Sequence, residues 1–110
     1  MNINNEIIED YKNHGVVLLK HVISNEWLEK LATGIKKNFK NPSQYKCVYE
    51  EDNGKEIFYD DYCNWQRIEE YKDFIFNSNI GKIAAQLMQS KKINLFHEHI
   101  LIKEPGATKR

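Results

Sequence analysis

Several features are scarce in this sequence, and each scarcity excludes a class of protein. The 110 residues carry no net charge, because 16 basic side chains balance 16 acidic ones. Without a net field of either sign, we expect neither nucleic acid nor an anionic membrane as a main partner. No run of roughly eighteen apolar residues occurs, so no segment is expected to span a membrane. The first residues lack a basic stretch followed by an apolar one, so we expect no secretory signal.

Cysteines and glycine-rich catalytic motifs are equally scarce. Cys47 and Cys63 are the two cysteines of the chain. In a protein without a secretory signal, such a pair predicts reduced thiols and a cytoplasmic location rather than a disulfide. The sequence also lacks a glycine-rich phosphate loop, a nucleophile elbow and a Cys-x-x-Cys pair. None of the chemistry that those motifs carry is therefore indicated.

The composition that remains is that of a folded domain. Hydrophobic residues make up 41% of the chain and charged residues 29%, which is too apolar for an intrinsically disordered protein. A chain of this length commonly forms one domain and buries about two-thirds of its unfolded surface. We therefore expect a single domain over residues 1–110.

Helix signals recur along the chain. The clearest follows Ser24, a helix-capping residue: apolar side chains recur every four residues from Trp27 to Phe39, and Pro42 prevents continuation. This stripe is predicted to belong to the core rather than to a ligand site. Similar caps and spacings predict three further helices, from Asn4 or Asn5 to His14-Gly15, from Ile68 to Phe76 and from Ser78 to Met88.

Strand signals lie between these helices. Val16–Leu19 is an unbroken aliphatic run, which predicts a strand buried on both faces. Tyr45–Glu50 and Glu56–Tyr62 flank Asp52-Asn53-Gly54, a strong hairpin signal. Asp60-Asp61 is predicted to be a solvated strand end rather than a paired-carboxylate site, because no third ligand lies at a fixed spacing. With a last strand near the C-terminus, the order α-β-α-β-β-α-α-β predicts an α+β domain with helices packed on one face of a sheet.

The last strand is predicted at Ile93–Lys103, and Pro105-Gly106 closes it with a turn. A period of two places His97 and His99 on one face. Two such imidazoles can share a metal ion, but no cysteine or carboxylate lies at a helpful spacing. We therefore favour histidines that line a polar barrel interior or are hydrogen-bonded in the core. Lys103 is predicted either to be a solvated strand end or to meet an anionic substrate group at the mouth of a pocket.

Five stretches of the chain share a further property. They are Tyr11–Val22, Ser24–Lys30, Phe58–Tyr62 with Asn64–Ile68, Ile83–Met88 and Leu95–Gly106. In this order they resemble the N-terminal part of the phytanoyl-CoA dioxygenase family, non-haem oxygenases that depend on Fe(II) and 2-oxoglutarate. The resemblance spreads across nearly the whole chain.

The resemblance implies a more specific fold and an activity. The expected fold is an N-terminal helical layer plus the first strands of a double-stranded β-helix, the jelly-roll or cupin-like architecture. In such enzymes the iron lies between two histidines and one carboxylate, with open positions for 2-oxoglutarate and O₂. The expected reaction is hydroxylation of an unactivated C–H bond in a small organic substrate, with 2-oxoglutarate decarboxylated to succinate.

The sequence departs from the family at the iron ligands. The family supplies its first two ligands as His-x-Asp after the strand and its Pro-Gly turn, and the third much later. His97-x-His99 lies before Pro105-Gly106, so it is not that motif. We therefore expect a truncated enzyme with no catalytic or metal-binding residue among residues 1–110. Such a fragment is expected to be inactive, marginally stable, prone to association and unable to hold iron tightly.

The resemblance also implies roles for individual residues. By position, His99 matches a pocket-lining site that can contact 2-oxoglutarate, and His97 lies one step back on the same face. Tyr62 and Trp65 fall near a region that can approach the same pocket. With Lys103, these residues are the candidate cofactor-binding set.

Two alternatives to the enzyme remain open. A non-catalytic α+β interaction module would pair with a partner strand through its exposed strand edge. A small metal-binding protein would use His97 and His99.

Overall fold

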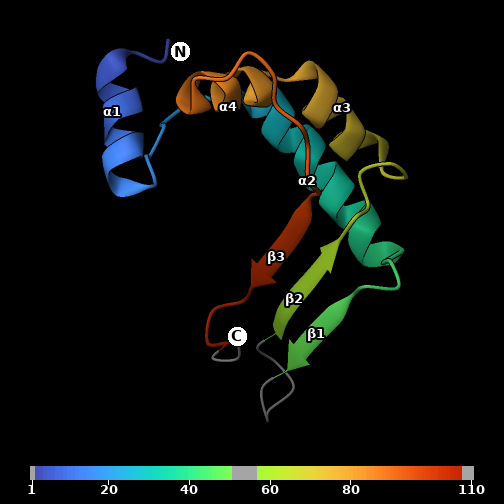
Figure 1. Ribbon diagram of the computed structural model, residues 1–110. Coiled ribbons are helices and arrows are strands. Elements are labelled where there is room, and N and C mark those ends of the chain that lie inside the picture. Colours follow the sequence, from blue (N-terminus) through green and yellow to red (C-terminus); the bar gives the residue numbers. More distant parts are fainter. Residues whose placement is uncertain (1, 51–56, 108–110) are drawn as a thin grey trace.

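The structure is a computed structural model and describes residues 2–50 and 57–107 (Figure 1). In these ranges the elements are α1 (Asn5–His14), α2 (Asn25–Lys40), β1 (Cys47–Glu50), β2 (Ile57–Tyr62), α3 (Glu69–Asn77), α4 (Ile80–Met88) and β3 (His99–Lys103). The predicted α+β class is confirmed. Within the described ranges, none of the helices is both long and apolar enough to cross a membrane.

The predicted helix ends are formed by the expected capping interactions. The Asn4 side chain accepts a hydrogen bond from the backbone N–H of Ile7 at 3.0 Å, and Gly15 ends α1 in the left-handed conformation with φ 73°. Ser24 caps α2 by accepting from the backbone N–H of Trp27 at 3.3 Å. These local signals therefore suffice to place α1 and α2.

Helices α2 and α3 pack against each other closely. Gly34 lies on the contact face, where an added Cβ would approach Tyr71 Cε1 to 2.8 Å. Lys30 pairs with Asp73, and Lys37 pairs with Glu70. The hydrogen bond from Lys37 is the main reason why the pKa of Glu70 lies below its ordinary value. The α2–α3 pair is thus joined by close packing at its centre and by ion pairs at its edges.

The sheet is antiparallel, with the order β1-β2-β3. Strands β1 and β2 confirm the two arms of the predicted hairpin, and the predicted turn at Asp52-Asn53-Gly54 lies outside the described residues. Strand β3 pairs with β2 so that His99 lies opposite Tyr62 and Lys103 opposite Phe58. The side chains of β3 alternate between exposed and half-buried, as the period of two predicts.

The predicted strand at Val16–Leu19 is wrong. The segment is extended but belongs to no strand, and Val16 and Leu18 are 70% and 79% exposed. It connects α1 to α2 at a distance from the sheet (Figure 1). An aliphatic run forms a strand only where a neighbouring backbone pairs with it, and none does so here in the part of the chain that the structure describes.

The last strand is also shorter than predicted, because residues 93–98 are not in a strand. Strand β2 ends at Tyr62, and the chain then leaves the sheet at Cys63, which has a φ of 61°. Residues before Glu98 therefore have no strand beside them among the described residues. They run instead along helices α3 and α4.

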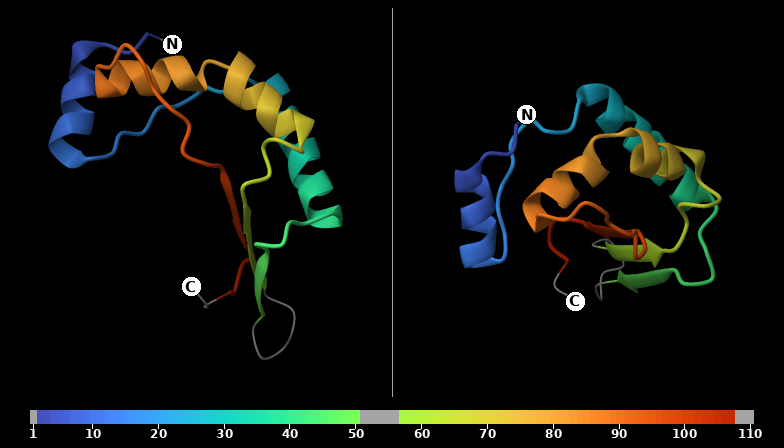
Figure 2. Two further views of the ribbon diagram at one scale, coloured as in Figure 1. Left: turned by 45° about the vertical axis from the view of Figure 1, so that its right-hand side comes forward. Right: turned by 45° about the horizontal axis from the view of Figure 1, so that its top comes forward.

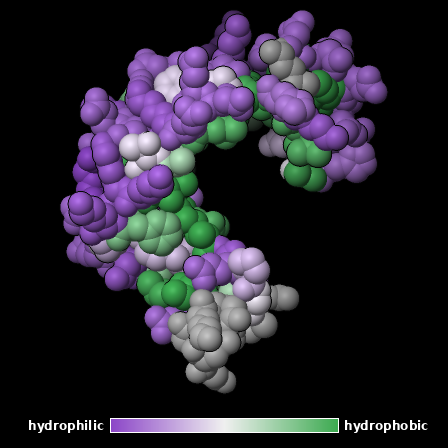
Figure 3. Space-filling view, turned by 180° about the vertical axis from the view of Figure 1, so that it is seen from behind, coloured by the Kyte–Doolittle hydropathy of each residue, from purple (hydrophilic) through white to green (hydrophobic). Residues whose placement is uncertain are grey.

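The molecule is an open crescent rather than a compact body. Helices α1, α4, α3 and α2 form an arch over one end of the sheet (Figure 2). The radius of gyration is 16.3 Å, against about 13 Å for a compact domain of this length. The accessible surface is 8340 Å², about 1,900 Å² more than the roughly 6,400 Å² expected for a compact protein of this mass. Apolar side chains gather on the inner side of the crescent (Figure 3).

The buried core is small and unusually polar. Its buried hydrophobic residues are Ile3, Tyr59, Ile68, Tyr71, Ile83 and Ala107. The largest side chains with no exposure are instead Asn38, Asp61 and Asn64. Phe39, the last member of the predicted apolar stripe of α2, stays 45% exposed while its ring packs on Tyr59 with centroids 4.2 Å apart. The stripe therefore packs on the sheet without being fully buried.

Candidate functional site

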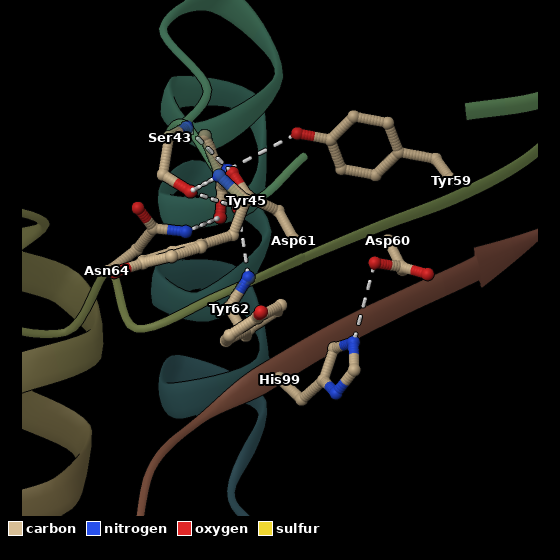
Figure 4. Close-up of polar contacts among 9 residues, drawn as sticks. Ser43, Tyr45, Tyr59, Asp60, Asp61, Tyr62, Asn64 and His99 are labelled. Carbon is tan, nitrogen blue, oxygen red and sulfur yellow. Dashed lines mark hydrogen bonds and ion pairs between the residues drawn. The ribbon is translucent and has the colours of Figure 1, made fainter. Parts of the chain in front are cut away.

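Strand β2 presents two chemically different faces. Tyr59 and Asp61 are buried on the side of α2, whereas Asp60 and Tyr62 alternate with them and lie on the other side (Figure 4). Residues that lie directly opposite each other in an antiparallel pair share a face. His99, the partner of Tyr62, therefore lies on the same face as Asp60 and Tyr62.

Asp61 is the centre of the buried face. Its carboxylate accepts hydrogen bonds from Asn38 Nδ2 at 2.8 Å, from the backbone N–H of Ser43 at 2.9 Å and from the Ser43 hydroxyl. The backbone N–H of Tyr62 donates a fourth, at 2.9 Å. Burial is the largest single influence and raises the pKa of Asp61, but these hydrogen bonds together outweigh it and hold the pKa below its ordinary value. The predicted solvated strand end is therefore wrong for Asp61, whose exposure is 0%.

Asn38 extends this network from α2 to α3. Its Oδ1 accepts from the Tyr71 hydroxyl at 3.1 Å and from Asn64 Nδ2 at 3.4 Å. Its Nδ2 also donates to the Tyr59 hydroxyl at 3.3 Å. Burial raises the pKa of Tyr71, so this hydroxyl stays protonated and acts as a donor. We call Asn38, Ser43, Asp61, Asn64 and Tyr71 the polar core.

Glu98 connects the polar core to the segment that carries the histidines. Its Oε2 accepts from the backbone N–H of Trp65 at 3.1 Å, and its Oε1 accepts from that of Asn64. Its own carbonyl accepts from the N–H of Cys63 at 3.1 Å. A carboxylate that accepts two backbone N–H groups fixes the turn after β2. Because Glu98 lies between the two histidines in sequence, the same contacts position both of them.

On the open face, aromatic rings gather around Tyr62. The Tyr62 ring centroid lies 5.2 Å from that of His99 and 5.9 Å from that of His97, and the two imidazole centroids are 6.1 Å apart. Tyr45 stacks on Tyr62 at 4.7 Å. His99 Nε2 also lies 3.6 Å from Asp60 Oδ1. We call Tyr45, Tyr62, His97 and His99 the histidine–tyrosine cluster.

The structure thus brings together three of the five predicted site residues, namely Tyr62, His97 and His99. Trp65 packs instead on Phe76 of α3, with ring centroids 5.7 Å apart. Lys103 is exposed at the far end of β3, four residues from His99 and therefore about 13 Å along the strand.

The cluster does not form a complete transition-metal site. Residues 2–50 and 57–107 contain no group of three or more His, Cys, Asp or Glu side chains that could hold one metal ion. The two-histidine, one-carboxylate iron site needs three ligands on one ion. His97 and His99 provide two imidazoles, whose ring centroids are 6.1 Å apart. These residues therefore do not fit an iron triad. Imidazole N–H groups and a tyrosine hydroxyl can instead donate hydrogen bonds to an anion.

An apolar groove lies on the inner side of the crescent, beside the start of β3. It has a volume of about 660 Å³ and is walled by the helices on one side and by residues 93–96 with Ile100 on the other. Its apolar wall residues include Leu31, Ile35, Phe74, Ile80, Leu95 and Ile100. Phe96, also in the wall, is 91% exposed. The concave surface is therefore hydrophobic and open to solvent.

Sequence reasoning missed the polar core, although one signal was present. Asn38 lies three residues after Ile35 and seven after Leu31, so it occupies a position on the apolar face of α2. An amide at such a position is buried only where it finds partners, which here come from Asp61 and Tyr71.

The comparisons with family models, with curated proteins and with solved structures each found no match for the chain.

Proposed function

We propose that this chain is the N-terminal portion of an Fe(II)- and 2-oxoglutarate-dependent dioxygenase of the phytanoyl-CoA dioxygenase type. The full enzyme would hydroxylate a small organic substrate. The observation that carries the proposal is the histidine–tyrosine cluster, because it places His97, His99 and Tyr62 together on the open face of a sheet. These are three of the residues that the resemblance assigns to the cosubstrate pocket.

The open shape supports the same proposal. The accessible surface of 8340 Å² is about 1,900 Å² larger than that expected for a compact domain of this mass. Further jelly-roll strands beside β3 would cover both its outer edge and the apolar groove. In this proposal the helical arch is the outer layer of the domain, and the sheet is one part of the barrel wall.

The residues of this chain would bind and orient rather than carry the oxidation. Iron and 2-oxoglutarate, when bound, supply the oxidising power for hydroxylation. His99 and Tyr62 would donate hydrogen bonds to a carboxylate of 2-oxoglutarate, with His97 beside them. Glu98 would hold these groups in place through the turn after β2. Lys103 would lie at the mouth of the pocket, and Trp65 would support the turn by packing on Phe76.

The proposal makes a direct prediction about the coding sequence. The codons that follow Arg110 should encode His-x-Asp or His-x-Glu within roughly ten residues, and a further histidine much later, because a facial triad needs a third ligand. A stop codon directly after Arg110 in an intact genome, with the 110-residue product detected in cells, would overturn the proposal.

The longer protein also allows a kinetic test of the cluster. His99→Ala should raise KM for 2-oxoglutarate about tenfold or more, because a hydrogen bond to a charged group contributes about 1.5–3 kcal/mol. KM for the organic substrate should change little. His14→Ala is the matched control, since His14 is an exposed imidazole at the end of α1. Equal KM values for 2-oxoglutarate in both variants would refute the role of His99.

A further inference from the structure

The free edge of β3 presents a defined set of backbone groups. The N–H of Cys63 donates to the carbonyl of Glu98 at 3.1 Å, and the N–H of Glu104 donates to the carbonyl of Ile57 at 2.9 Å. Because hydrogen-bonded positions alternate along an antiparallel strand, the even-numbered residues of β3 bond to β2. The N–H and C=O groups of His99, Leu101 and Lys103 therefore point away from β2. In residues 2–50 and 57–107, β3 pairs with no strand except β2.

We propose that two copies of this chain form a dimer by antiparallel pairing of their β3 strands. The two-fold axis passes beside Leu101, so that Leu101 faces Leu101 of the second copy and His99 faces Lys103 of the second copy. In this register every outward-pointing group of the strand finds a partner, which gives about six hydrogen bonds between the copies. An isologous contact of this kind closes on itself and does not propagate.

The side chains near this edge support a second copy as the occupant. In the proposed register Ile100 lies opposite Ile102 of the second copy, and both are half-buried on the side of the apolar groove. Phe96, which is 91% exposed, lines the same groove as Ile100. The chain carries no net charge, so two copies do not repel each other.

The available surface is large enough for a stable dimer. The chain exposes about 1,900 Å² more than a compact protein of its mass, whereas a standard interface buries about 800 Å² on each partner. The other edge of the sheet is less suitable, because β1 has four residues against five in β3, and a very short edge strand offers few groups for pairing.

The dimer is proposed for the 110-residue chain. In a longer chain, a following strand of the same chain would take the place of the second copy. The dimer and the enzyme are therefore tested on different molecules, and either proposal can fail alone.

A cysteine at the symmetry axis tests the register. In a Cys47→Ser/Cys63→Ser background, Leu101→Cys should form a covalent dimer under mild oxidation. The facing Cα atoms of a hydrogen-bonded antiparallel pair are about 5.5 Å apart, within the range of a disulfide. Val48→Cys in the same background is the matched control, because Val48 is 41% exposed on the other edge strand. Cross-linking of Leu101→Cys no faster than that of Val48→Cys would overturn the proposal.

A proline tests the hydrogen bonds themselves. Leu101→Pro removes an N–H that points away from β2, so the fold of each copy should survive and the dimer dissociation constant should rise about tenfold or more. Ile100→Pro removes an N–H that bonds to β2 and should instead lower the midpoint of unfolding. Sedimentation equilibrium measures the association. A wild-type chain that is monomeric at tens of micromolar, or that forms only open-ended aggregates, contradicts the proposal. If Leu101→Pro fails to fold, the cross-linking result decides.

Discussion

Asp60 and Asp61 follow each other in β2, but they lie on opposite faces of the strand and have different surroundings. Asp61 has no exposure and four hydrogen-bond donors. Asp60, one residue earlier, lies on the open face with His99 at 3.6 Å. The polar core therefore holds α2, α3 and the sheet together, whereas the histidine–tyrosine cluster can be changed without unpairing a fully buried group. Side chains that the fold does not need are those available to bind a ligand, and this difference motivates the assignment of the site to the open face.

The largest effect should come from exchanging a single oxygen for nitrogen on the buried face. Asp61→Asn places an amide group among donors and should lower the free energy of unfolding by about 3 kcal/mol, since a buried polar group without its partner costs about 1–3 kcal/mol and more when charged. Asp60→Asn is the matched variant on the open face and should cost less than about 1 kcal/mol, because its side chain keeps some exposure and has one long contact, to His99 at 3.6 Å. Urea denaturation measures both. Similar values would show that the two faces do not differ energetically.

A smaller loss is expected where α2 packs on α3, beneath the polar core. Gly34→Ala would bring Cβ to 2.8 Å from Tyr71 Cε1 and 3.1 Å from Glu70 Cβ, and overpacking of this kind costs about 1–3 kcal/mol. Gly81→Ala is the control, because the single atom of the described residues that its Cβ would meet is Ile93 Cδ1, at 3.6 Å. That variant should be neutral or gain up to about 1 kcal/mol from helix propensity. Thermal unfolding of both variants decides. A Gly34→Ala protein as stable as Gly81→Ala would contradict the close packing.

The two faces should also differ in their response to acid. The folded-state pKa of Asp61 is held below its ordinary value, so its contribution to stability is complete above about pH 4 and is lost as the pH falls through the lower folded-state value. In Asp61→Asn, the free energy of unfolding should therefore fall less steeply below about pH 4 than in the wild type. The remaining decline would come from Glu70 and Asp73, whose pKa values are also lowered. Urea titrations at pH 3 to 6 test this. If the free energy of unfolding falls equally steeply with acid in Asp61→Asn and in the wild type, the ion pairs between α2 and α3 cause the decline.

The smallest effect is expected on the open face. His97→Ala/His99→Ala should change the free energy of unfolding by less than about 1 kcal/mol, because the His99 side chain is 38% exposed and its contact with Asp60 is long, at 3.6 Å. Titration of wild type and this double variant with Zn(II) should show equally weak binding, since the cluster lacks a third ligand. Tight binding that the double variant loses would favour the alternative of a small metal-binding protein.

Helices and their ends could be predicted from the sequence because their determinants are local. Ser24 caps α2 and Gly15 ends α1 through contacts within a few residues. The arms of the hairpin also follow from local pattern. Val16–Leu19 shows the limit of such reasoning: its aliphatic residues fit a buried strand, yet no partner backbone lies beside it in the described part of the chain.

The sequence by itself determined the α+β class, the caps of α1 and α2, and the alternation that puts His99 and Leu101 on one face of β3. Only the tertiary structure decided that Asp61 is buried while Asp60 is not, that residues 93–98 leave the sheet, and that His97, His99 and Tyr62 meet. The reason is physical. A helix satisfies its backbone within a few residues, whereas a strand or a buried polar side chain depends on groups distant in sequence.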